Sequence, residues 1–162
     1  MPSAKSTSPR PGLYSRGSWR TFLLLGACLA FGCASAPRRG ADSVRATLDG
    51  FLSALNALDA DRIASYFADD ITAFVPTAQG SRLDGKGAVA EVFRAYCEKT
   101  RKTTSRTNIV PENLTVEQIG SVALVTFEVP SPASVARRTF VFRKRNGSWL
   151  ISHFHASNFV LP

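Results

Sequence analysis

Two histidines, His153 and His155, are the side chains whose type and spacing best suit chemistry, and the chain has no others. The aromatic and branched residues around them predict a β-strand, in which residues two apart share a face. An imidazole in an apolar pocket can have its pKa moved into the working range of a general acid or base. For His153 we prefer a hydrogen bond that orients the strand, because it has no visible partner. For His155 catalysis and orientation stay equally open.

Two histidines on one strand face also suit metal coordination, but a zinc site needs a third protein ligand. Glu128 is the only strand carboxylate nearby, and the sequence does not determine its direction. We therefore expect no metal and no cofactor. Cys97 lies on the apolar side of a predicted helix, which indicates packing rather than nucleophilic catalysis. No P-loop, paired-glycine fingerprint or Ser/His/Asp order is present.

The elements that must position the histidines are three helices followed by a series of strands. Apolar residues at helical spacing predict helices that start at Asp42 or Ser43, near Asp61, and after Gly87. Alternating and β-branched runs predict strands at 71–75, 108–110, 114–119, 122–129, 137–145 and 148–159. This order is typical of an α+β fold with helices packed on a curved antiparallel or mixed sheet. The length allows one domain, at residues 42–160.

The last predicted hairpin turns at Asn146-Gly147, as Gly120-Ser121 does in an earlier one. Its aromatic-rich face is expected to point toward the helices, which puts His153 deep and His155 nearer a rim. A slip of one residue would change the pairs but keep both histidines on one side. The register predicts that these residues face one another: Lys144 and Trp149, Phe142 and Ile151, Phe140 and His153, and Arg138 and His155.

Several aromatic side chains could line a ligand pocket, although aromatics at helical spacing more often belong to a core. Tyr96 is the one whose hydroxyl would need a partner if it were buried. The candidate ligand-binding residues are Tyr96, Phe74, Phe93, Phe140 and Trp149, and the candidate catalytic residues are His155, His153 and Arg138.

Four short motifs follow one another in a consistent order: YFADDI at 66–71, DGKGAV at 84–89, TFVFRK at 139–144 and NGSWLISHFHAS at 146–157. Together they resemble the SnoaL-like branch of the nuclear transport factor 2-like superfamily. The resemblance covers residues 42–159 and implies a cone-shaped, cystatin-like α+β barrel with a pocket between sheet and helices. It also implies homodimers paired through the outer sheet surface. No single activity is implied, because such folds host isomerases, cyclases, dehydratases and binding domains.

One activity of that superfamily can be tested by residue. Ketosteroid isomerases use a general-base carboxylate and an oxyanion hole made of a tyrosine and a protonated aspartic acid. The positions of the base and the tyrosine fall on Val75 and Phe51. The second acid would fall near Arg138 or Thr139, where there is no carboxylate. These residues exclude that mechanism.

Residues 1–33 have the pattern of a signal peptide: a basic segment, an apolar core at 21–31, and small residues. That core is too short to span a bilayer as a helix. LGAC at 25–28 and AFGC at 30–33 resemble the lipobox of bacterial lipoproteins, in which the cysteine is lipidated. Cys28 has the better local match, but the core length favours Cys33.

The lipobox predicts a protein held in the bacterial cell envelope by its N-terminal lipid, with residues 34–41 as a tether. The alternative is a soluble periplasmic or secreted protein that is cut near Ala34. The net charge of +8 includes four leader bases, and without them 16 bases remain against 12 acids. Apart from two groups, at 101–106 and 137–145, these bases are spread along the chain. They form no basic-aromatic recognition motif, so we expect no nucleic-acid partner.

Three functions remain open at this point. The first is an exported, lipid-anchored domain that binds a small, largely apolar molecule. The second is an isomerase, cyclase or dehydratase that uses His155 with Arg138 and Tyr96. The third is a non-catalytic dimeric interaction module, which a cavity too small for a ligand would favour.

Overall fold

The computed structural model describes residues 38–76 and 81–162, with side chains from residue 43 onward. In the described residues no helix is both long enough and apolar enough to cross a membrane. The helices are α1 (Arg38–Asn56), α2 (Ala60–Ser65) and α3 (Lys86–Arg101). The strands are β1 (Phe67–Phe74), β2 (Arg82–Asp84), β3 (Glu112–Ile119), β4 (Val122–Pro130), β5 (Ser134–Arg145) and β6 (Ser148–Val160).

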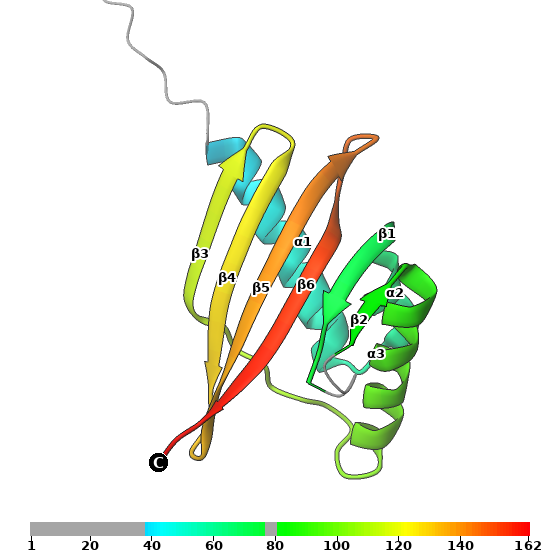
Figure 1. The fold of residues 1–162 in the computed structure, drawn as a ribbon, viewed down its shortest axis with the longest axis vertical. Coiled ribbons are helices and arrows are strands. Elements are labelled where there is room, and N and C mark those ends of the chain that lie inside the picture. The colour runs from blue at the N-terminus through cyan, green and yellow to red at the C-terminus, as the bar shows by residue number, and fades with distance from the viewer. Residues whose placement is uncertain (1–37, 77–80) are drawn as a thin grey trace, which may run out of the picture. The chain divides into compact units, whose positions relative to one another are not determined.

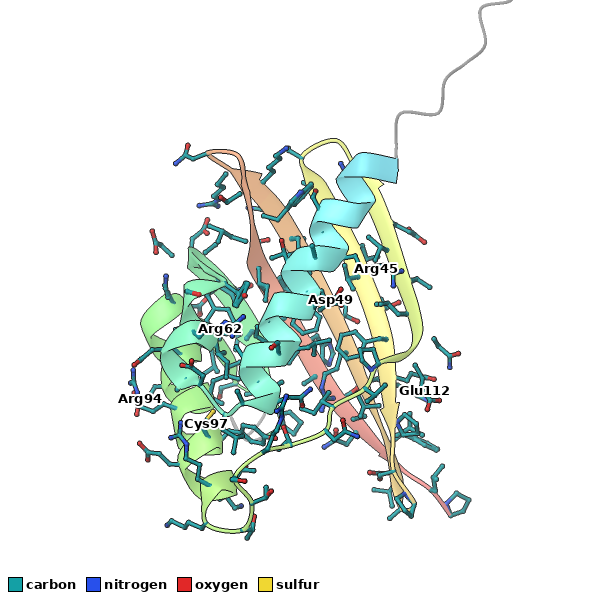
Figure 2. The ribbon with its side chains drawn as sticks, turned by 180° about the vertical axis from the view of Figure 1, so that it is seen from behind. Arg45, Asp49, Arg62, Arg94, Cys97 and Glu112 are labelled. Carbon is teal, nitrogen blue, oxygen red and sulfur yellow. The ribbon has the colours of Figure 1, made fainter. Side chains whose placement is uncertain are left out.

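The described strands form one six-stranded sheet in the order β2-β1-β6-β5-β4-β3 (Figure 1). β1 pairs with β6 in parallel, and every other neighbouring pair is antiparallel. The predicted α+β class with a curved, mixed sheet is therefore confirmed. α1 crosses one face of the sheet, and α2 and α3 lie at the end formed by β1 and β2 (Figures 1 and 2).

The core lies between α1 and the sheet face that it covers, which we call the inner face; the opposite one is the outer face. Along β6 the inner face carries Trp149, Ile151, Phe154 and Ala156, all buried. Phe51 of α1 is 1% exposed. Its ring packs against four others, with ring centroids 5.5 to 6.1 Å apart: those of Tyr66, Phe67, Phe93 and Phe140. Burying a large aromatic in this way contributes about 2 to 3 kcal/mol.

α1 starts earlier than the sequence predicts, at Arg38, inside the segment expected to be a tether. Neither Asp42 nor Ser43 can be its N-cap, because both lie within the helix. Ser43 instead accepts a hydrogen bond of 2.9 Å from Nε1 of Trp149. The side chain that was expected to begin the helix therefore ties the helix to the sheet.

Three further segments differ from the prediction. β1 begins at Phe67, where the second helix was expected to continue. Just before the strand, Tyr66 O accepts a hydrogen bond of 2.8 Å from Ile151 N of β6. β2 was not predicted. Residues 108–110 form no strand; instead, the side chain of Asn56 binds the backbone of Ile109. Its Oδ1 accepts from Ile109 N at 2.7 Å and its Nδ2 donates to Ile109 O at 3.2 Å.

Both predicted hairpin turns are confirmed. Ile119 faces Val122 across Gly120-Ser121, and Arg145 faces Ser148 across Asn146-Gly147. The second turn has φ of 48° and 85° at its two residues, the left-handed conformation that a tight Asn-Gly hairpin requires.

The predicted register of this hairpin is correct only as far as Phe142 and Ile151. Beyond them Ser152 is an extra residue in β6, a β-bulge, and its Oγ donates to Val141 O at 3.0 Å. From there Val141 faces His153, and Phe140 faces Phe154 instead of His153. The two histidines share a side, as expected, but the expected side is wrong: they point to the outer face.

Candidate functional site

The histidines lie beside the end of β1 on the outer face. Nδ1 of His153 is 2.7 Å from Oγ1 of Thr72, and the rings of His153 and His155 lie 6.1 and 6.0 Å from that of Phe74. Partial burial lowers the pKa of His153 below its ordinary value of 6.5, and the charges of His155 and Arg82 lower it further. His153 is therefore a neutral, hydrogen-bonded group near neutral pH.

A shallow hollow of about 570 Å³ adjoins the histidines, lined by Phe74, Val75, Pro76, His153, His155 and Ala156. None of these residues is a carboxylate. Glu128 lies two strands away, where it accepts from Asn113 at 2.8 Å and lies 3.9 Å from Arg137. Over the part of the chain that the structure describes, no three His, Cys, Asp or Glu residues form a metal site.

Arg138 lies on the other side of the sheet from the histidines, because it faces Ala156 and not His155. Its Nη1 donates to the carbonyls of Arg137 (2.8 Å) and Ser157 (3.0 Å) and to Oδ1 of Asn158 (3.4 Å). Burial lowers the pKa of Arg138 from its ordinary value, and nearby Tyr96 acts in the opposite direction. The three predicted catalytic residues are thus divided between the two faces.

Phe140 and Trp149 belong to the core rather than to a pocket. Phe140 is 1% exposed and stacks on Phe154, with centroids 4.7 Å apart. Trp149 is 5% exposed and is held by its hydrogen bond to Ser43. Phe74 lies with the histidines on the outer face.

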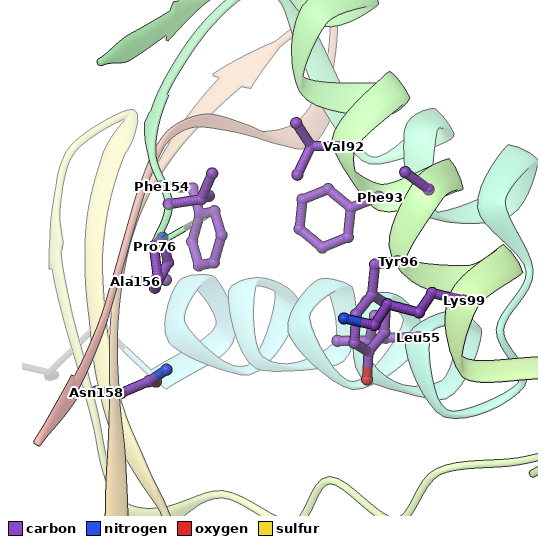
Figure 3. A pocket seen from close by; sticks show the side chains of 11 residues that line it. Leu55, Pro76, Val92, Phe93, Tyr96, Lys99, Phe154, Ala156 and Asn158 are labelled. Carbon is purple, nitrogen blue, oxygen red and sulfur yellow. The ribbon is translucent and has the colours of Figure 1, made fainter. Parts of the chain in front are cut away.

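A second cavity, of about 500 Å³, opens on the inner side between α3, α1 and the ends of β1 and β6 (Figure 3). Its size suits a small molecule, for which pockets of roughly 300 to 1,000 Å³ are usual. Two of the predicted ligand-binding residues, Phe93 and Tyr96, contribute to it. The cavity is lined by Leu55, Val75, Pro76, Val92, Phe93, Ala95, Tyr96, Lys99, Phe154, Ala156 and Asn158.

Lys99 and Asn158 are lining residues that the sequence analysis missed. Each could have been found from its spacing. Lys99 lies three residues after Tyr96, on the same side of α3. Asn158 continues the alternation of Phe154 and Ala156 along β6.

The family model for the SnoaL-like domain matches residues 44–162 of this chain. No curated protein sequence matches the chain.

Solved structures share the fold at low sequence identity. A candidate dehydratase of the NTF2-like family from Streptomyces avermitilis has 22% identity and a TM-score of 0.64, covering 78% of this chain and 99% of its own. A protein with a cystatin-like fold from Caulobacter vibrioides has 20% identity and a TM-score of 0.59, covering 76% and 91%. The association domain of CaMKII from C. elegans has 23% identity and a TM-score of 0.57, covering 74% and 95%.

These similarities agree with the order of helices and strands and with the family resemblance of the four motifs. The family model matches well over half of the sequence, including every described strand. The chain belongs to the family of SnoaL-like domain proteins.

Proposed function

We propose that this protein is exported, is anchored in the bacterial cell envelope by an N-terminal lipid, and binds a small, largely apolar molecule. The observation that carries the binding function is the cavity of about 500 Å³ on the inner side of the sheet. Leu55, Val92, Phe93 and Phe154 give it an apolar body, and burial of apolar ligand surface there would drive binding.

Binding is preferred over turnover because the two histidines, the candidate general acids or bases, lie outside this cavity. Among the described residues, those that line the cavity include neither a histidine nor a carboxylate. His155 and Arg138, paired in the enzyme hypothesis, occupy opposite faces of the sheet. An isomerase, cyclase or dehydratase acting through His155 would have to hold its substrate in the shallow outer hollow. His155→Ala tests that alternative on a bound molecule identified by native mass spectrometry. Turnover and binding that are both unchanged in this variant would exclude it.

The binding site is tested with the full-length protein in lipid nanodiscs and the neutral fluorescent probe N-phenyl-1-naphthylamine. Ala95 lies at the exposed edge of the lining, so Ala95→Trp fills the cavity without disturbing the core. We expect it to weaken probe binding at least tenfold. Glu98→Trp, on the same helix but outside the lining, is the matched control and should bind like the wild type. Equal binding by Ala95→Trp and the wild type would reject the cavity as the site.

The lipid anchor rests on the sequence of residues 1–33, which lie outside the described residues. Cys33→Ser is expected to move the protein from the membrane fraction to the soluble fraction, while Cys28→Ser leaves it in the membrane. The reverse result would assign the lipid to Cys28. If neither substitution changes the fractionation, the protein is not a lipoprotein.

We also propose that the domain forms a homodimer through the outer face. Large apolar side chains are exposed there: Phe74 (39%), Val122 (39%) and Leu124 (40%). Next to them lie Thr139 and Val141, which are only partly exposed. Covering these residues with the same face of a second copy would bury apolar surface. The similarity to an association domain supports an oligomer.

A further inference from the structure

The inner cavity has two unlike ends. Val92, Phe93 and Phe154 make one end apolar, whereas Lys99, Tyr96 and Asn158 bring polar groups to the other. Lys99 and Asn158 extend toward each other from α3 and β6 across the cavity (Figure 3). A ligand that matched both ends would have an apolar body and one polar head.

The polar end carries positive charge that no acid neutralises. None of the 11 lining residues is acidic, and Lys99 forms no ion pair with any residue that the structure describes. Arg138 donates to Oδ1 of Asn158, and its partners among the described residues are all oxygen atoms of uncharged groups. Arg138 is partly buried, and a partly buried cation without a counter-ion is costly. Lys99 is exposed to solvent and lines the cavity, so its charge adds to the attraction for an incoming anion.

Asn158 is oriented to help bind an anion. Its Oδ1 accepts from Arg138 at 3.4 Å, so the other end of the amide, the donor Nδ2, is left for the cavity. The hydroxyl of Tyr96 can donate as well. The polar end thus offers an ammonium group and two neutral donors, the set that recognises a carboxylate.

We propose that the cavity binds an amphipathic acid, with its hydrocarbon body on the apolar residues and its carboxylate on Lys99, Asn158 and Tyr96. Arg138 is a second positive charge that also holds the Asn158 amide in place. This inference rests on the proposed binding function and narrows it to one chemical class.

Displacement of N-phenyl-1-naphthylamine from the full-length protein by decanoate and by 1-decanol tests the inference. The two molecules share a ten-carbon body and differ in the head group. We expect decanoate to bind at least tenfold more tightly, although the alcohol is the less water-soluble of the two. The Ala95→Trp protein in the same nanodiscs measures the background from the lipid.

Lys99→Met keeps the length of the side chain and removes its charge. It should reduce the affinity for decanoate at least tenfold, and reduce the affinities for decanol and the probe much less. Lys102→Met removes an exposed lysine just after α3, outside the lining, and should change neither affinity.

Equal binding of decanoate and decanol by the wild type would overturn the inference, and so would an equal loss of both in Lys99→Met. Either result leaves the proposed function standing if Ala95→Trp still abolishes probe binding. Probe binding that Ala95→Trp does not weaken rejects the cavity itself, and with it both proposals.

Discussion

At the scale of single residues, His153 is held neutral by its surroundings. It is half-buried and shares a hydrogen bond of 2.7 Å with Thr72. The charges of His155 and Arg82 disfavour protonation of its ring. A neutral imidazole in this place orients β6 against β1. That is the structural role preferred for it from the sequence.

This environment predicts a pH dependence of stability. The pKa of His153 is lower in the folded protein than its ordinary value of 6.5, so the unfolded chain binds the proton more tightly. The free energy of unfolding should be highest above pH 6.5 and should fall as the pH drops through 6.5 toward the folded-state pKa. Urea denaturation between about pH 5 and 8 measures this change.

His153→Gln should remove most of that decrease, since glutamine does not titrate. His155→Gln should reduce it only in part, because the charge of His155 is the second cause of the lowered pKa and desolvation is the first. A profile that keeps its full slope in His153→Gln would assign the dependence to other groups.

The sequence predicted that the two histidines share a side of the strand, but not which face of the sheet they point to. It placed both histidines on one side of a strand, because alternation is a local property. Which side that is depends on the bulge at Ser152. The available signal was a change of phase, since the buried residues Trp149 and Ile151 are followed by Phe154 and Ala156.

At the level of the strands, the bulge lets the buried residues Trp149, Ile151, Phe154 and Ala156 lie on one face of a continuous β6, although their spacing is not a regular alternation. Ser152 takes up the extra residue, so that Ile151 and Phe154 both point inward although three positions separate them. Without it, the regular alternation would bring His153 and His155 into the core and turn Phe154 outward.

Two single-residue deletions in β6 should therefore differ sharply. Deleting Ser152 leaves a regular ladder with every later side chain on its present face, and should cost about 1 kcal/mol for the lost hydrogen bond to Val141. Deleting Leu150 also removes one residue, but it moves Ile151 outward and puts Ser152 into the core. We expect that change to cost about 3 kcal/mol or more.

Chemical denaturation of both deletion variants compares the two costs. Ser152→Ala is the control for the hydrogen bond alone and should resemble the Ser152 deletion. If the two deletions were equally destabilising, the assignment of Ser152 as the extra residue would be incorrect.

The elements that the sequence predicted best are those with local signals. The three helices follow from apolar spacing, and the hairpins follow from Gly120-Ser121 and Asn146-Gly147. The parallel pairing of β1 with β6 joins residues about 80 positions apart, such as Phe67 with Ile151, and no local pattern encodes it. The start of β1 at Phe67 depends on that pairing and was missed for the same reason. The short β2 pairs with β1 alone and was missed as well.

At the scale of the whole molecule, the proposed homodimer gives a prediction for the outer face. Leu124→Arg puts a charge among the exposed apolar residues of the outer face and should shift the protein to the monomer in sedimentation experiments. Val160→Arg is the control, because this side chain is 74% exposed at the end of β6 and follows the inner-side alternation of Ala156 and Asn158. A dimer that survives Leu124→Arg and dissociates with Val160→Arg would place the interface elsewhere.

The place of β6 in the sheet also affects when the domain can fold. β6 is the last described element along the chain, yet it lies inside the sheet, between β1 and β5. Until residues 148–160 are available, β1 and β5 have no strand to join them, and Phe67, Phe140 and Phe142 lack the surface that buries them. This order delays folding until nearly all of the domain has been synthesised, which would suit the proposed export if it uses a channel that accepts only unfolded chains.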